Sequence, residues 1–273
     1  MRRFFFKGLP TLLGLATLFL FSYFRHNTNS TIMKRSILFF TTIILAGLLS
    51  LQAQSISPDI YFDDEPGTHN MGITSDGEFF YTCNGGKTFE GKISKFSKNG
   101  NFMKSYEIDL DMRSIMFNSK DGLLYVNCYD NNIYKITDLE AGSFQLMYSK
   151  LYSNDQASLA LGPKGKFLYY LDDGTLKVYD FAKGTLENTF YGVNCGPELG
   201  SGAYSVAVSK KYIITFNAEK QVFYLHDKKG NFKEAIKFED GDYGFSLSYA
   251  NGYIFVAKDG DYGMGKWYGY ASK

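Results

Sequence analysis

The feature that most constrains the fold of this 273-residue chain is a five-residue pattern that recurs five times. Each copy has any residue first, then Ser or Asn, an apolar residue, usually a small residue, and a second apolar residue. The Ser or Asn stands at positions 70, 114, 158, 205 and 246, so the steps between copies are 44, 44, 47 and 41 residues. Self-similarity at this period indicates that one structural unit is repeated in space.

Each of the first four copies is followed by two turns in the same order, and the fifth by the first of them. The first turn is Asp-Gly or Asn-Gly in three of the units, and a second apolar stretch comes after it. The second turn holds a glycine two residues before an apolar residue, at Gly100, Gly142, Gly184 and Gly230. Short apolar stretches around Asp-Gly or Asn-Gly are the strongest local signal of a β-hairpin. The two turns in phase therefore predict four antiparallel strands in each unit.

Four-stranded units at this period are typical of a β-propeller. One blade cannot cover both of its own faces, so the blades have to pack around an axis, where small residues relieve crowding. A sandwich of short strands is the alternative, and the in-phase recurrence of two turn signals disfavours it. We therefore predict an all-β fold: a five-bladed β-propeller of four-stranded antiparallel blades, preceded by a hydrophobic N-terminal segment.

The two ends of the repeat region complement each other. The fifth unit lacks a fourth strand, and residues 56–62 precede the first unit without belonging to any complete one. We predict that strand 56–62 pairs with strand 265–270, which closes residues 54–273 into a single five-bladed domain. A sixth blade without a recognisable pattern is the alternative.

This arrangement of strands and turns resembles the tryptophan-aspartate, NHL and YVTN repeat propellers. They share the Ser-apolar-small-apolar strand, the Asp-Gly turn and the Gly-x-Phe turn. The resemblance covers residues 55–273 and identifies an architecture, not one family, because the tryptophan-aspartate dipeptide is absent and those propellers usually have more blades. It implies that ligands bind on the face that carries the loops before the first strands and after the second strands.

That implied face holds candidate ligand-binding residues from every blade. The candidates are His69, Arg113, Asp130, Asp172, Tyr204, Phe245 and Asp259. Carboxylates next to planar rings suit a sugar, a cationic peptide or a divalent ion, and binding residues often lie on loops of a rigid scaffold. The other interpretation is that these residues only cap the channel. The predicted partner is an unknown small molecule, glycan or protein.

A duplicated Asp-Gly-Asp-Tyr-Gly motif, at residues 240–244 and 259–263, offers a weaker metal hypothesis. The carboxylates are those of Asp240, Asp242, Asp259 and Asp261, and oxygen ligands in glycine-containing loops suit Ca²⁺. The motif lacks the twelve-residue spacing and terminal Glu of a calcium loop, and Asp and Gly are ordinary turn residues. We therefore predict no metal and no other cofactor, with calcium as the alternative.

Signals of catalysis are few. Of the three histidines, only His69 lies near the implied face, and no Ser/His/Asp arrangement or two-histidine metal set emerges. A formal charge of +1 gives no electrostatic case for nucleic-acid binding. We predict a binding or interaction scaffold without catalytic residues. The alternatives are a lactonase-like or glycosidase-like hydrolase that uses Asp130, Asp172 and Asp259, and a structural adaptor of a larger envelope complex.

Residues 1–53 differ chemically from the rest, because they hold six Lys and Arg residues and no acid. Met33-Lys34-Arg35, an apolar run over 37–51 and the small Ala53 make the pattern of a secretory signal. We predict that translation starts at Met33, so that residues 1–32 are an over-extended start of the sequence. We also predict cleavage after Ala53 and export to the periplasm, cell surface or medium. The alternative is a membrane anchor formed by the apolar runs, each shorter than a spanning helix.

Three cysteines do not make a disulfide framework. Cys83 and Cys128 each lie six residues after a turn glycine, which puts them at the same place in adjacent blades. Equivalent points on neighbouring blades are usually too far apart for a disulfide. We predict that both are free, buried thiols.

Overall fold

The computed structural model describes residues 55–193 and 204–272. The predictions for residues 1–53, including the start at Met33 and the cleavage after Ala53, lie outside the described residues. The described residues belong to one compact unit, Gln54–Lys273. Within the described residues, no helix has the length and apolar character that crossing a membrane requires.

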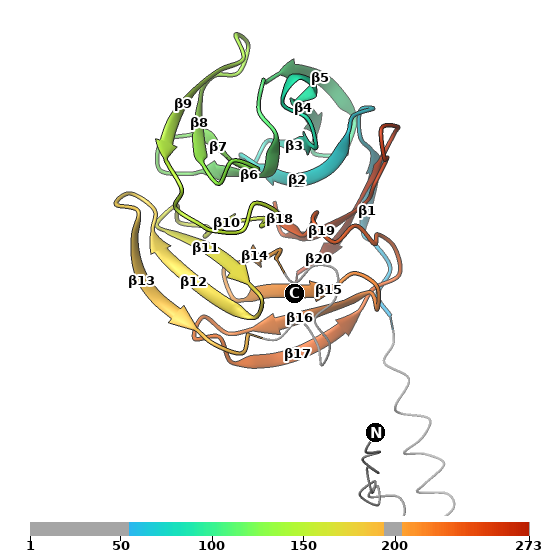
Figure 1. Ribbon diagram of the computed structural model, residues 1–273. Coiled ribbons are helices and arrows are strands. Elements are labelled where there is room, and N and C mark those ends of the chain that lie inside the picture. The colour runs from blue at the N-terminus through green and yellow to red at the C-terminus, as the bar shows by residue number, and fades with distance from the viewer. Residues whose placement is uncertain (1–54, 194–203, 273) are drawn as a thin grey trace, which may run out of the picture. The chain divides into compact units, whose positions relative to one another are not determined.

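Five antiparallel sheets of four strands surround one axis as blades (Figure 1). Blade one contains β2 (His69–Ser75), β3 (Phe79–Gly85), β4 (Lys92–Ser97) and β5 (Phe102–Glu107). Blade two contains β6 (Met112–Asn118), β7 (Leu123–Cys128), β8 (Ile133–Asp138) and β9 (Ser143–Tyr148). Blade three contains β10 (Ala160–Leu161), β11 (Phe167–Asp172), β12 (Thr175–Asp180) and β13 (Thr185–Phe190). Blade four contains β14 (Ala207–Val208), β15 (Ile213–Asn217), β16 (Val222–His226) and β17 (Phe232–Lys237). Blade five contains β18 (Ser248–Ala250), β19 (Tyr253–Lys258), β20 (Lys266–Ala271) and β1 (Ile60–Asp63).

The prediction of a five-bladed, all-β propeller is confirmed. The helical structure among the described residues is the short 3₁₀ turn η1 (Thr88–Glu90).

The first hairpin turn of blade one shows why the Asp-Gly signal works. Asp76 Oδ1 accepts hydrogen bonds from the backbone N–H groups of Glu78 and Phe79, both at 2.7 Å. Its other carboxylate oxygen accepts one from the Tyr81 hydroxyl at 2.9 Å. Gly77 follows in the left-handed region, with φ of 95°. The turn therefore fixes both the chain reversal and the start of the second strand.

The ring closes where the two ends of the propeller meet. β1 pairs antiparallel with β20, so that Phe62 lies opposite Trp267, and this strand is the outermost of blade five. The outer strand is shorter than the predicted 56–62. Just beyond it, the buried carboxylate of Asp64 accepts hydrogen bonds from Trp267 Nε1 (2.7 Å) in blade five and from Asn70 Nδ2 (2.9 Å) and Thr82 Oγ1 (3.0 Å) in blade one. A single buried acid thus joins the last blade to the first.

Hydrogen bonds near the axis link every pair of adjacent blades. Most use the small hydroxyl residues of the recurring pattern, which explains why the pattern prefers them at the crowded centre. The contacts in order around the ring are Ile73 N to Ser248 Oγ (3.2 Å), Phe117 N to Thr74 Oγ1 (3.0 Å), Ser114 Oγ to Leu159 O (2.9 Å), Ser158 N to Tyr204 O (3.0 Å) and Ser205 Oγ to Gly244 O (2.9 Å).

The strand pairing corrects the alignment of the first repeat. Gly72 lies opposite Cys83 directly after a bulge, as Ser114 lies opposite Asn127 in blade two. Gly72, and not Asn70, is therefore the counterpart of Ser114. A slip of two residues keeps every side chain on the same face of a strand, so the pattern could not reveal it. The glycine is needed because a Cβ there would lie 3.0 Å from the backbone nitrogen of Ile115.

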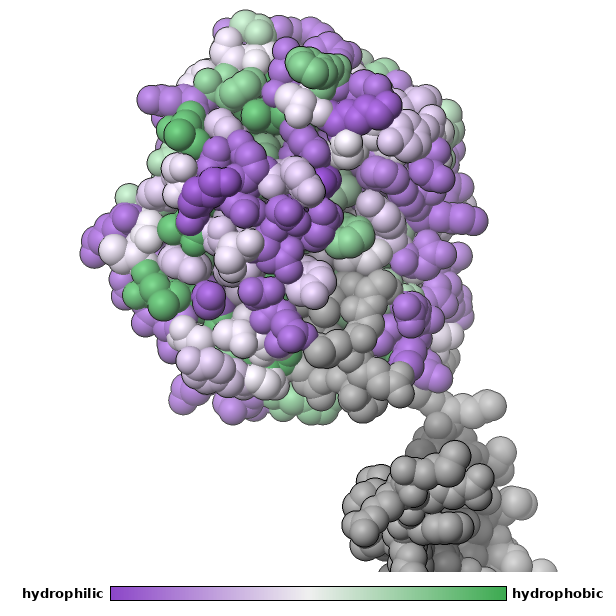
Figure 2. Space-filling view, viewed as in Figure 1, coloured by the Kyte–Doolittle hydropathy of each residue, from purple (hydrophilic) through white to green (hydrophobic). Residues whose placement is uncertain are grey.

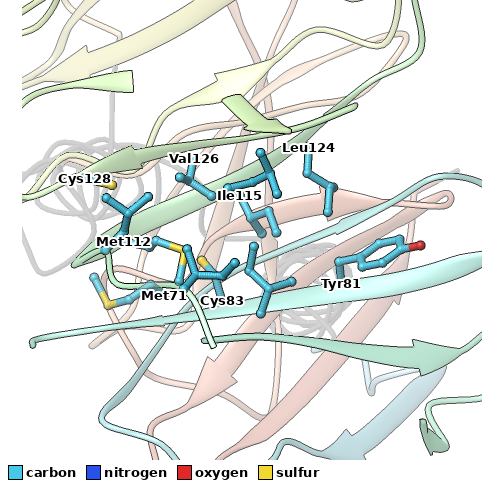
Figure 3. Packing of buried hydrophobic residues seen from close by; sticks show 12 residues of the cluster. Met71, Tyr81, Cys83, Met112, Ile115, Leu124, Val126 and Cys128 are labelled. Atoms are coloured by element: carbon cyan, nitrogen blue, oxygen red, sulfur yellow. The ribbon is translucent and has the colours of Figure 1, made fainter. Parts of the chain in front are cut away.

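The core between blades one and two contains both described cysteines (Figure 3). Cys83 and Cys128 are free and buried, as predicted. The corrected register shows that they are not equivalent, since Cys83 lies opposite Gly72 and Cys128 lies opposite Met112. Burial raises the pKa of both thiols, so they are protonated at neutral pH and pack as small apolar groups.

An apolar layer lies along the channel. Each blade contributes one residue, which lies in its innermost strand or directly before it: Ile73, Ile115, Leu159, Val206 and Leu247. These residues also line a cavity of about 250 Å³ whose rim includes Asp76 and Asn251 from the first hairpin turns. This axial cavity therefore belongs to the end of the ring opposite to the one that carries the predicted ligand loops.

Candidate functional site

The upper face is defined here as the end of the ring that carries the loops before the innermost strands and after the second strands. At this face His69, the first residue of β2, approaches Asp259, which directly follows β19. His69 Nδ1 lies 2.6 Å from Asp259 Oδ2, and the other carboxylate oxygen accepts the backbone N–H of Asn70 at 3.0 Å. In a neutral imidazole, this contact places the proton on Nδ1, where it is donated to the carboxylate. The lone pair of Nε2 can then accept a hydrogen bond or coordinate a metal ion. Both side chains are partly exposed, His69 by 28% and Asp259 by 16%.

Two tyrosine rings flank the imidazole of His69. Tyr243 stacks on it with ring centroids 5.9 Å apart, and Tyr262 meets it edge-on at 5.5 Å. Burial raises the pKa of Tyr243, and the negative charges of Asp259 and Asp261 add to this effect while Arg113 opposes it. The Tyr243 hydroxyl therefore stays neutral at physiological pH. Tyr262 is 56% exposed, and Lys87 Nζ lies over its ring.

Arg113 lies at the bulge of β6 and is buried to 6% exposure. Its Nη1 forms an ion pair with Asp111 at 3.0 Å, and its Nε donates to the backbone oxygen of Asp155 at 3.3 Å. The guanidinium also lies 4.9 Å from the ring centre of Tyr129, which is 47% exposed. A buried cation held in this way orients the loops of blades one, two and three around the channel mouth.

The structure brings some of the predicted site residues together and keeps others apart. His69 and Asp259 are in contact, and Phe245 packs edge-on against Tyr243 at 5.6 Å. Asp130 Oδ2 instead accepts a hydrogen bond from the Tyr134 hydroxyl at 2.6 Å, within its own blade. Asp172 accepts a hydrogen bond from Asn154 at 3.3 Å.

Tyr204 has a structural role near the axis. Its backbone oxygen accepts a hydrogen bond from Ser158, and its ring packs partly buried against the core between blades two and three. The three carboxylates of the hydrolase hypothesis, Asp130, Asp172 and Asp259, therefore have separate sets of contacts.

Three potential metal ligands converge at the upper face. Within the described part of the chain, His69, Asp259 and Asp261 each offer one donor atom, and these atoms lie within 4.8 Å of one another. Asp240 and Asp242 are not in this group, so the four-carboxylate calcium arrangement does not form as hypothesised. One imidazole with two carboxylates fits a divalent cation that keeps open coordination positions.

The two tyrosines that flank His69 were missed as site residues, although a signal for them existed. Tyr243 and Tyr262 occupy the same place in the two copies of the Asp-Gly-Asp-Tyr-Gly motif. One copy precedes the innermost strand of blade five, and the other follows its second strand. The duplication therefore places one tyrosine on each side of His69, which a reading of the motif as calcium ligands overlooks.

The chain matches no family model and no curated protein. Among solved structures it is similar to Myxococcus xanthus glutaminyl cyclase, with a TM-score of 0.55 and 10% identity over 81% of this chain and 100% of that one. It is also similar to virginiamycin B lyase from Staphylococcus aureus (TM-score 0.41, 12% identity, 73% of this chain and 66% of that one). A third similar structure is apo AztD from Citrobacter koseri (TM-score 0.36, 14% identity), where the match covers 66% of this chain and half the length of that chain. The five blades identify the chain as a propeller, and the likeness to the glutaminyl cyclase extends to the fold alone.

Proposed function

We propose that this protein is an exported binding scaffold that holds a polar ligand at the upper face, with a glycan as the first candidate. The observation that carries the proposal is the cluster of His69, Asp259, Tyr243 and Tyr262. It combines an exposed aromatic face with carboxylate acceptors and a free imidazole nitrogen, and it joins blades one and five. Sugars are bound by this combination, because their C–H faces stack on rings while their hydroxyl groups donate to carboxylates.

Support for a binding surface also comes from the surroundings of the cluster. Lys87 Nζ lies 4.8 Å from the ring centre of Tyr262 and forms an ion pair with Glu90 at 2.9 Å. Charged groups of both signs thus border an exposed ring. On the side of the propeller seen in Figure 2, hydrophilic residues predominate and hydrophobic residues lie among them.

A glycan array probed with the purified protein tests this function. We expect selective binding that Tyr262→Ala weakens about tenfold, as loss of one stacking ring requires. Tyr61→Ala is the matched control, because Tyr61 is also an exposed tyrosine and lies on the outer strand β1, outside the cluster. An array without selective binding, or equal affinities for Tyr262→Ala and the unmodified protein, would contradict the proposal.

A second candidate function is metal-assisted hydrolysis, and the convergence of His69, Asp259 and Asp261 favours it. A divalent cation there would act as a Lewis acid and lower the pKa of a bound water. We expect the protein to retain Zn²⁺ or Mn²⁺ after dialysis and to hydrolyse a lactone or nitrophenyl glycoside only when metal is bound. Asp261→Asn, which alters an exposed ligand, should abolish both effects. Metal retention without turnover would leave binding as the function. A pull-down under native conditions would then show whether the protein binds a partner of the cell envelope or only a small ligand.

A further inference from the structure

A second cavity lies away from the upper-face cluster, between blades three and four. Its volume is about 570 Å³, within the range of small-molecule sites of about 300–1,000 Å³. Phe167, Tyr169 and Val178 from blade three and Phe190 from its outermost strand supply an apolar surface. Tyr169 and Val178 are themselves buried, at 8% and 6% exposure, so this surface is the outer side of the core between the two blades.

The rim of this cavity is cationic. It contains four lysines and one acid, and the residues are Lys164, Lys166, Lys210, Lys228 and Glu187. The lysines come from the first hairpin turns of both blades and from the turn after β16. Four lysines and one glutamate leave an excess of three positive charges around this apolar cavity. The cavity is therefore complementary to an anion.

Lys228 is exposed at the surface, and its ammonium group is nonetheless held in place by hydrogen bonds. Its Nζ donates hydrogen bonds to the backbone oxygens of Ser209 (2.6 Å) and Tyr212 (3.1 Å). It also lies 5.7 Å from the ring centre of Tyr169. Two of its three N–H donors are thereby used and one is left for a ligand. Burial lowers the pKa of Lys228 to about 8, which a bound anion would reverse.

We propose that the cavity between blades three and four binds a small amphipathic anion, whose carboxylate lies among the lysines and whose apolar body covers Phe167, Tyr169 and Phe190. The site is separate from the upper-face cluster, since it shares no residue with it. Its chemistry selects against cations of the same shape, because four ammonium groups repel them, and against neutral analogues, because these leave the lysine charges unpaired.

Isothermal titration with dodecanoate and with 2-naphthoate tests the proposal on the full chain. We expect saturable one-to-one binding of at least one of them, with a Kd below about 100 µM, as the affinity per atom of small ligands allows. Dodecyltrimethylammonium and dodecan-1-ol, with the same alkyl chain, should bind at least tenfold more weakly. No saturable binding of either anion, or equal binding of the cationic analogue, would overturn the proposal.

Variants connect the binding to the cavity. Lys228→Met and Lys210→Glu should each weaken binding about tenfold or more, because each removes a cation from the rim. Lys210 makes no hydrogen bond that the fold needs among the described contacts, so its variant remains informative if Lys228→Met fails to fold. Lys229→Met is the matched control, since Lys229 is adjacent in sequence, exposed and outside the lining. Equal loss in all three variants would show non-specific binding and reject the site.

Discussion

His226, at the end of β16, is a buried titratable side chain. It is 1% exposed, neither of its ring nitrogens makes a well-aligned hydrogen bond among the described residues, and its ring lies edge-on to Phe232 at 6.0 Å. Burial lowers its pKa below the ordinary value of 6.5, although nearby backbone groups of Ile213 and Tyr224 and the charge of Asp227 oppose the shift. The native state therefore disfavours the charged form of this imidazole.

This burial predicts a specific loss of stability in acid. As the pH falls below about 6.5, the unfolded chain takes up a proton at His226 before the folded protein does, so the free energy of unfolding decreases. The slope from one such group is at most about 1.4 kcal/mol per pH unit. Replacing His226 by Leu should remove this contribution and leave the stability at pH 8 unchanged or higher. Urea unfolding at pH 5, 6, 7 and 8 measures it.

Phe232→Leu serves as the comparison. Phe232 lies edge-on to the His226 ring and carries no titratable group, so this variant should keep the full acid slope. If His226→Leu keeps the full pH dependence of the unmodified protein, the buried imidazole is not its source.

At the scale of strands and turns, the sequence predicts the five-bladed architecture because the strands and turns carry local chemical signals. The Asp76 carboxylate and its glycine force a hairpin whatever surrounds them. Register is different, because a shift of two residues leaves the side-chain faces unchanged, and Gly72 was consequently misaligned. The site was predicted in part for a similar reason. Loop positions identified His69 and Asp259, whereas the contact of Tyr262 with His69 depends on how two distant blades pack.

The second turn of each blade shows how a local signal can also report a contact between blades. Gly100 has φ of 78°, and a Cβ on it would lie 2.5–2.6 Å from atoms of Phe62 in the preceding blade. Gly184 is placed in the same way against the Tyr148 ring. Gly142 and Gly230 occupy the corresponding turns of blades two and four. The recurring Gly-x-Phe turn is therefore both a chain reversal and a contact surface for its neighbour.

Substituting Gly100 by Ala should separate these two roles when it is compared with Gly122→Ala. Gly122 has a similar φ of 74° but has nothing within 4 Å of a new Cβ. Its substitution should cost only the backbone strain, about 1–2 kcal/mol. Gly100→Ala should cost about 1–3 kcal/mol more, because overpacking against Phe62 adds to the strain. Guanidinium unfolding of both variants measures the difference, and equal losses would contradict an interblade role for Gly100.

For the whole molecule, the closure of the ring through β1 is the feature on which cooperativity depends. Phe62 of this strand contacts the rings of Phe96 (5.0 Å) and Phe80 (6.0 Å) in blade one and of Phe255 (6.3 Å) in blade five. Together with the bonds of Asp64 to both blades, these contacts hold blade five, whose outermost strand β1 comes from the start of the domain and whose other three strands come from its end. A propeller closed in this way should unfold as one unit, because opening the junction exposes the edge of β20 and the faces of two blades.

Trp267 lies in β20 opposite Phe62 and is the only tryptophan in the chain, so its fluorescence reports the junction directly. In the unmodified protein, the fluorescence and far-UV circular dichroism transitions in urea should coincide, as two-state unfolding requires. Phe62→Ala should lower the stability by about 3–5 kcal/mol, because a large buried ring is lost. Tyr61→Ala, next to it but 63% exposed, should change it by less than about 0.5 kcal/mol. A fluorescence transition well before the dichroism transition in the unmodified protein, or equal effects of the two variants, would show that the blades hold together without this strand.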